Sequence, residues 1–242
     1  MAKPNGYVLF ETDKIVSIAT GFEKPSANEK TGPMVQIWFL VRADDPVSAV
    51  RKGTDTSVCF DCPLMKQTIL THPLKRKPDI TRIKDERKCY VGLEKAPLSI
   101  WTAWRNGNYP TLTDYSIFNG REVRFGAYGE PVLLPFPMVR EIASRASLWT
   151  GYTHQWRNPL VQAYKPFLMA SCDESDYAEA RARGWRCFIV TKEPTAIAGA
   201  VNCPASKEAG ARTQCFKCGL CNGAVMTDRK VKSTKDVWIA EH

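Results

Sequence analysis

Four cysteines in the last quarter of the sequence place the strongest constraint on how this chain can fold. Cys215, Cys218 and Cys221 are separated by two residues each, and eleven residues separate Cys203, which precedes a proline, from Cys215. Thiols at this spacing can surround one compact metal centre, and a remote Cys-Pro pair can supply a fourth ligand. A fold that serves this pattern must bring all four sulfur atoms together.

The same spacing favours an iron–sulfur cluster over zinc. Ferredoxin-like sites combine a C-x₂-C-x₂-C run with a Cys-Pro ligand, although here the Cys-Pro ligand comes first. Gly219 and Gly223 allow the backbone to approach a cluster or to adopt positive φ. Zinc sites made of four cysteines normally use two separate pairs, whereas here Cys218 would be shared by two overlapping pairs. We predict a cluster, with 4Fe–4S favoured and zinc as the alternative, on Cys203, Cys215, Cys218 and Cys221.

A second group of cysteines lies in the first half of the chain. Cys59 and Cys62 form a C-x₂-C pair, and Cys89 follows a basic stretch. The three are a candidate second metal site, and the fourth ligand stays open among Cys172, Cys187, His72 and His154, or is absent. A thiol pair or buried core cysteines are the other interpretations. The C-x₃-C-x₂-C motif of radical-SAM enzymes does not occur, and four ligands at the later site argue against an open iron there.

The cysteine count and the N-terminal sequence together predict a cytoplasmic protein without membrane association. The chain has nine cysteines, an odd number, so they cannot all pair as disulfides within one chain. The first residues lack an apolar segment followed by a cleavage site. No apolar run approaches the roughly 20 residues that cross a bilayer. In a reducing compartment, dense cysteines indicate metal binding or catalysis.

The formal charge of +9 favours nucleic acid as a partner. A basic stretch between the first cysteines carries the candidate phosphate contacts, which are Lys75, Arg76, Lys77, Arg82, Lys84, Arg87 and Lys88. A generic basic surface is the alternative interpretation of this charge.

Hydrophobic periodicity predicts an α/β fold. The N-terminal part, residues 1–120, reads as β-rich, with strands expected at 7–10, 15–19 and 35–41 and helices after Asp45 and at 97–105. The pattern then alternates through strands at 123–128, 168–171, 186–190 and 200–202 with helices near 137–146 and around 178–182, the last capped by Asp173 or Ser175. This alternation is typical of βαβ units in a partial barrel or an open parallel sheet. We predict regions 1–120 and 121–242, which can be one integrated domain.

One polar segment outside the cysteine groups is a candidate for chemistry. His154 lies in a mixed polar and aromatic segment, and it is either a hydrogen-bonded structural histidine or a general base, nucleic-acid contact or metal ligand. Arg124, Tyr128 and Glu130 can line the same end of the sheet or form an ordinary strand-to-loop transition.

Several segments together resemble an uncharacterised cysteine-rich protein family found in phages and related mobile elements. They are 31–36, 59–63 with 89–91, 96–101, 124–131, 151–156, 184–186 and 203–223. The resemblance covers most of the chain and implies a phage or plasmid context, hence a bacterial cytoplasm, but no activity.

The expected function is therefore that of a phage-type protein that binds an iron–sulfur cluster and associates with nucleic acid. Two alternatives stay open. One is a metal-dependent enzyme that runs redox or nucleotide chemistry on a βα scaffold, and the other is a phage factor that binds a host protein and contains structural zinc.

Overall fold

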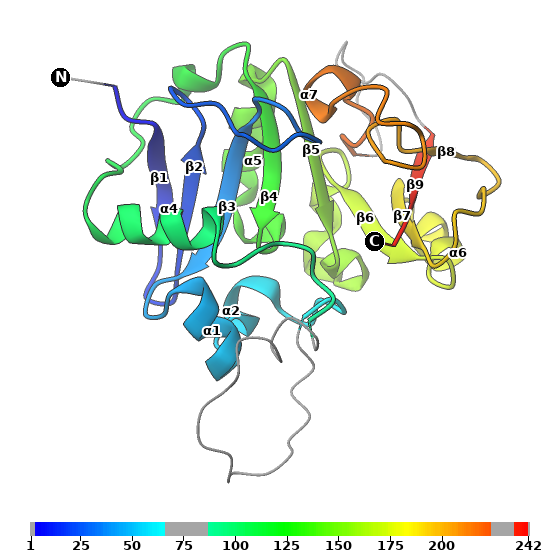
Figure 1. Cartoon of the computed structure of the whole chain (residues 1–242), viewed down its shortest axis with the longest axis horizontal. Coiled ribbons are helices and arrows are strands. Elements are labelled where there is room, and N and C mark those ends of the chain that lie inside the picture. Colours follow the sequence, from blue (N-terminus) through cyan, green and yellow to red (C-terminus); the bar gives the residue numbers. More distant parts are fainter. Residues whose placement is uncertain (1–2, 66–86, 224–234, 242) are drawn as a thin grey trace, which may run out of the picture.

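The computed structural model describes residues 3–65, 87–223 and 235–241 and forms a nine-stranded mixed sheet flanked by helices (Figure 1). The strand order is β1-β2-β3-β4-β5-β6-β7-β9-β8. The strands are β1 (Gly6–Glu11), β2 (Ile15–Thr20), β3 (Val35–Val41), β4 (Glu122–Tyr128), β5 (Leu148–Thr153), β6 (Met169–Asp173), β7 (Cys187–Thr191), β8 (Ala200–Asn202) and β9 (Asp236–Ala240). Only the β1–β2 and β2–β3 pairs are antiparallel, so the predicted α/β class is confirmed.

Six short α-helices and four 3₁₀ turns connect the strands of the described residues. They are α1 (Pro46–Lys52), α2 (Thr56–Cys59), α4 (Ala96–Arg105), α5 (Phe136–Arg145), α6 (Tyr177–Ala182) and α7 (Cys215–Cys218), with 3₁₀ turns η1 (Tyr115–Phe118), η2 (Pro131–Leu133), η3 (Gln155–Arg157) and η4 (Pro159–Tyr164). Among the helices of the described ranges, none combines the length and apolar character needed to cross a membrane.

Local capping explains why α1 was predictable and why the start of α6 was not. Asp45 accepts hydrogen bonds from the N–H groups of Val47 and Ser48 at 3.0 and 3.1 Å, and Gly53 ends α1 in the left-handed region. The prediction that Asp173 or Ser175 caps α6 is wrong, because Asp176 is the N-cap residue. The Asp173 carboxylate instead accepts from the Ser175 hydroxyl and the Asp176 N–H, which closes a turn before the helix.

The sequence analysis did not predict two strands, β5 and β9, and each of them pairs with a neighbour on both sides inside the sheet. β5 pairs with β4 and β6 at the middle of the sheet. β9 follows the second cysteine region in sequence and inserts between β7 and β8. The sheet is continuous across residue 121 because β3 pairs with β4.

The two faces of the sheet differ in chemistry. Phe125, Trp149 and Leu168 belong to the main core, which includes the apolar side of α5. The opposite face carries Arg124 and, in register beside it on β5, Thr150. Further along this face, Met169, Phe188 and Val237 form a second apolar cluster that includes Cys203 and Cys221. The later cysteines therefore lie over one face of the sheet rather than in the main core.

Candidate metal centre

The four cysteines of the later motif converge on one cavity. Cys203, Cys215, Cys218 and Cys221 all line one small pocket that is partly open to solvent. Thr150 and Tyr152 of β5 and Val237 of β9 contribute to its walls. All nine cysteines of the chain are free thiols. We call this pocket the four-thiol pocket.

The loop before β3 holds the first of the clustered cysteines in place. Cys215 begins α7, and its backbone N–H donates to the carbonyl of Lys30 at 2.9 Å. The next residue, Phe216, donates to the carbonyl of Thr31 at 3.2 Å and packs over Gly32, where a Cβ atom would come within 2.4 Å of its ring. The late cysteine motif is thereby attached to a segment almost two hundred residues earlier in the chain.

The end of the motif is fastened to the sheet itself. The N–H of Gly151, in β5, donates to the carbonyl of Cys221 at 3.0 Å. Gly223 has a φ of 91°, and a Cβ atom there would meet the carbonyl oxygen of Pro166 at 2.3 Å. Only glycine permits this close approach.

Arg186 is the main polar support of this loop. Its guanidinium is buried and donates to the carbonyls of Leu220 and Gly223 at 2.9 and 2.8 Å and to the side-chain oxygen of Asn222 at 3.0 Å. It also donates to the carbonyl of Lys235. Sequence reasoning did not select Arg186, although a charged residue directly before the apolar run of β7 was a usable signal.

Burial raises the pKa of three pocket thiols, those of Cys203, Cys215 and Cys221, and so favours their protonated form in the metal-free chain. It raises the pKa of Cys221 well above its ordinary value, and Cys203 and Cys215 raise it further, whereas a hydrogen bond with Tyr152 lowers it. Burial also raises the pKa of Cys215 to about 11, against the opposing charge of Arg124. The pKa of Cys203 is likewise raised by burial and lowered by Lys30. These mutual effects require the thiols to be near neighbours, and a metal must displace their protons.

Two buried guanidinium groups interact electrostatically with pocket cysteines, although neither residue lines the pocket itself. The Nε atoms of Arg124 and Arg186 have no hydrogen-bond partner among the residues that the structure describes. Arg124 interacts electrostatically with Cys215, and Arg186 interacts with Cys221. Buried donors without partners are uncommon in folded proteins. Both groups therefore place positive charge near the pocket thiols.

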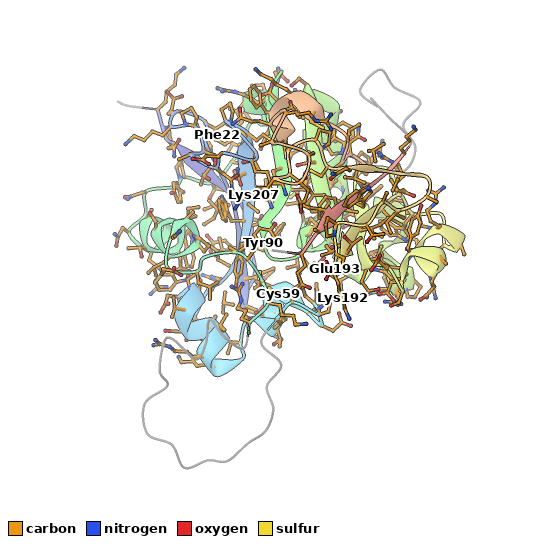
Figure 2. The ribbon with its side chains drawn as sticks, turned by 45° about the vertical axis from the view of Figure 1, so that its right-hand side comes forward. Phe22, Cys59, Tyr90, Lys192, Glu193 and Lys207 are labelled. Atoms are coloured by element: carbon orange, nitrogen blue, oxygen red, sulfur yellow. The ribbon has the colours of Figure 1, made fainter. Side chains whose placement is uncertain are left out.

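The three cysteines of the earlier group also meet in space, at the carboxyl ends of β3, β4 and β5. Cys59 ends α2, and the N–H of Cys62 donates to its carbonyl at 3.0 Å. The N–H of Cys89 donates to the carbonyl of Leu64 at 2.9 Å, which fastens the third cysteine to the loop of the first two. Figure 2 shows Cys59 at the lower end of the sheet, with Tyr90 above it.

His154 and Glu130 complete this second group, which we call the three-thiol group. Nδ1 of His154 lies 3.4 Å from Sγ of Cys62 and 2.9 Å from Oε1 of Glu130. The buried Glu130 carboxylate also accepts from the Thr153 hydroxyl at 2.6 Å and the His154 N–H at 3.0 Å. Burial lowers the pKa of His154, but the hydrogen bonds to Cys62 and Glu130 outweigh it and raise the pKa to about 10.

Of the residues that the sequence left open as a fourth ligand, His154 alone is recorded in contact with a cysteine of this group within the described ranges. Cys172 and Cys187 belong to the main core, and a hydrogen bond between the two thiols raises the pKa of Cys172. His72 lies outside the described residues.

The predicted nucleic-acid contacts are only in part visible. Lys75, Arg76, Lys77, Arg82 and Lys84 lie outside the described residues, and Lys88 is exposed. Arg87 turns inward, because its guanidinium donates to the carbonyls of Cys89 and Val91 at 3.3 and 2.7 Å. It also lies 6.0 Å from the ring centre of Tyr128. Arg87 thus supports the Cys89 segment.

Within residues 3–65, 87–223 and 235–241, no three histidine, cysteine, aspartate or glutamate side chains are already arranged to hold a metal ion. Comparisons of the chain with protein-family models, with curated proteins and with solved structures found no match.

Proposed function

We propose that this chain is an iron–sulfur protein whose cluster is bound by Cys203, Cys215, Cys218 and Cys221. The observation that carries the proposal is that all four thiols line the same cavity. In a 4Fe–4S cluster each of the four thiolates would bind a different iron. The overlapping spacing of Cys215, Cys218 and Cys221 favours a cluster over a zinc site built from two separate pairs.

The surroundings of the four-thiol pocket support a negatively charged group. Four thiolates and four sulfides together carry more negative charge than the four irons of a 4Fe–4S cluster offset, so such a site is stabilised by nearby cations and hydrogen-bond donors. Arg124, Arg186 and Lys30 supply positive charge next to the cysteines. Tyr152 supplies a hydroxyl donor to Cys221.

The cluster would also join three distant parts of the fold. Cys203 follows β8 and donates its N–H to the carbonyl of Trp238 in β9, while Cys215 is bound to the loop at Lys30. Cys221 is bonded to Gly151 of β5. Metal binding at this place therefore stabilises the folded state directly, because the ligands are brought together only by folding.

Anaerobic purification of the full chain, with iron, sulfide and zinc analysis and a visible spectrum, tests the proposal. We expect iron and acid-labile sulfide in equal amounts, together with the broad visible absorbance of a thiolate-bound cluster. Cys187→Ala is the matched control, because it removes a buried thiol that does not line the pocket. A colourless protein that contains only zinc contradicts the proposal.

Association with nucleic acid stays a prediction from the charge of +9. If it holds, the logarithm of the binding constant for duplex DNA falls linearly with the logarithm of the salt concentration, by about 0.9 for each phosphate neutralised. Affinity for DNA and RNA that does not depend on salt would remove it.

A further inference from the structure

A row of three polar residues crosses the face of the sheet that also carries the four-thiol pocket. Gln36 of β3, Arg124 of β4 and Thr150 of β5 lie side by side in register. All three residues are buried, and Arg124 is only 8% exposed. Because Gln36 and Thr150 are uncharged, the strands on either side of Arg124 supply no negative charge at this level of the sheet.

The charge of Arg124 has no recorded counter-charge. In the part of the chain that the structure describes, no carboxylate forms an ion pair with its guanidinium. A buried cation is normally paired, because burial removes the water that would otherwise solvate the charge. The residues that line the four-thiol pocket do not include Arg124. The guanidinium therefore calls for an anion of its own.

At least one hydrogen-bond donor of Arg124 is unused. The hydrogen bond recorded for its side chain runs from Nη2 to the hydroxyl of Tyr90, at 2.9 Å. The Nε atom is buried and has no partner among the described residues. Since buried donors nearly always find an acceptor, an acceptor that the described chain does not supply is expected at Nε.

Arg186 shows how the same sheet uses an arginine for support. Its Nε atom also lacks a partner, but its other nitrogens donate to the carbonyls of Leu220 and Gly223 and to the side chain of Asn222. These bonds hold a loop in place. Arg124 holds no backbone segment by a recorded bond, because its one recorded acceptor is a side-chain hydroxyl. Support of the fold therefore does not explain why Arg124 is buried.

Tyr90 separates Arg124 from solvent and offers a second donor. The residue is 71% exposed and lies in the segment 87–92, which has no regular secondary structure. Figure 2 shows it near the middle of the view, above Cys59. Its hydroxyl oxygen accepts from Arg124, so the hydroxyl proton is left to donate to another group. Because most of the side chain faces solvent, a small displacement of Tyr90 gives a solute access to the guanidinium.

We propose that Arg124 and Tyr90 bind a small carboxylate, which accepts hydrogen bonds from Nε of Arg124 and from the hydroxyl of Tyr90. A carboxylate has two oxygens in one plane and a single negative charge, which match one guanidinium. A phosphate monoester carries about 1.5 to 2 negative charges, more than one buried arginine balances. No thiol and no metal takes part, so this site is independent of the iron–sulfur assignment.

Isothermal titration calorimetry of the full chain with sodium acetate tests the site, with sodium chloride at the same ionic strength as the blank. We expect one acetate to bind per chain and Arg124→Gln to abolish the binding. The matched control is Arg105→Gln, which changes the net charge equally at an exposed position and should leave the affinity unchanged. A wild-type chain that binds acetate no better than chloride overturns the proposal, as does an equal loss of affinity in both variants.

Tyr90→Phe tests whether two donors act together. The variant removes only a hydroxyl from a mostly exposed side chain, so the fold is retained. We expect acetate to bind about tenfold more weakly, because one hydrogen bond to a charged acceptor is lost. An unchanged affinity overturns the part assigned to Tyr90. Sodium phosphate is titrated in the same way, and phosphate that binds more tightly than acetate overturns the choice of a carboxylate.

Discussion

The two cysteine groups differ in how the fold attaches them. The four-thiol pocket lies over a sheet face, and its loop is bonded to β5, β9 and the segment at Lys30. The three-thiol group lies at the carboxyl ends of the strands and has an ionisable pair beside it. If the four later thiols bind a cluster, that cluster joins remote segments and adds stability, whereas the three earlier thiols lie beside a carboxylate and an imidazole that are bonded to each other.

The largest expected effect is a difference in thermal stability between variants of the two cysteine groups. We predict that Cys215→Ser removes the pocket cluster and lowers Tm by on the order of 10 °C, because several kcal/mol of metal-dependent stability are lost. Cys62→Ser should lower Tm by only a few degrees, because Cys62 is only half-buried and serine keeps a polar contact with His154. Anaerobic thermal denaturation with iron analysis measures both. If Cys215→Ser and Cys62→Ser lowered Tm equally, the two cysteine groups would not differ in their contribution to stability.

A second prediction tests the close approach that closes the pocket. Gly223→Ala places a Cβ atom against Pro166 at positive φ, so we expect a loss of about 3 kcal/mol and weaker iron retention. Gly210→Ala is the matched control, since Gly210 also has positive φ but nothing lies within 4 Å of the added atom. It should cost about 1 kcal/mol. Denaturant unfolding under anaerobic conditions gives both values, and similar costs would show that the contact with Pro166 is unimportant.

These predictions rest on contacts that the sequence could show only in part. The α1 helix was predictable because Asp45, Pro46 and Gly53 are local signals. The late thiols could be selected because Cys215, Cys218 and Cys221 recur every three residues, and all four line one pocket, while a shared cluster stays a prediction. One interpretation of the sequence placed Glu130 at the same end of the sheet as His154, but not the hydrogen bond between them, which depends on β4 and β5 lying side by side. β9 was missed because a short strand gains its stability from β7 and β8, which are distant in sequence.

A third prediction concerns the polar support of the pocket. Arg186→Gln leaves the buried carbonyls of Leu220 and Gly223 without their donor, and we expect a loss of about 2 kcal/mol. Arg186→Lys keeps the charge but cannot reach all acceptors, so it should recover less than half of that loss. The exposed Arg183→Gln is the control and should stay within about 0.5 kcal/mol. Unfolding free energies decide the matter, and an Arg186→Gln value as small as the control would contradict this role.

The smallest expected effect is on the reduction potential of the proposed cluster in the four-thiol pocket. Arg124 is a buried cation near Cys215, so Arg124→Gln should favour the less negative oxidised cluster. We expect the reduction potential to fall by on the order of 50 mV, about a tenfold change for one electron. A spectroscopic redox titration measures it, with the exposed Arg105→Gln as the control. A potential that rises would contradict the charge argument.

X-ray absorption at the iron edge, on the variant that lacks Cys59, Cys62 and Cys89, tests the four-thiol cluster most directly. In that protein, every bound iron must belong to Cys203, Cys215, Cys218 and Cys221. We predict iron surrounded by sulfur with other iron atoms at short distance, as in a cluster. A folded variant that contains no iron, or a zinc ion with only sulfur neighbours, would contradict the central claim.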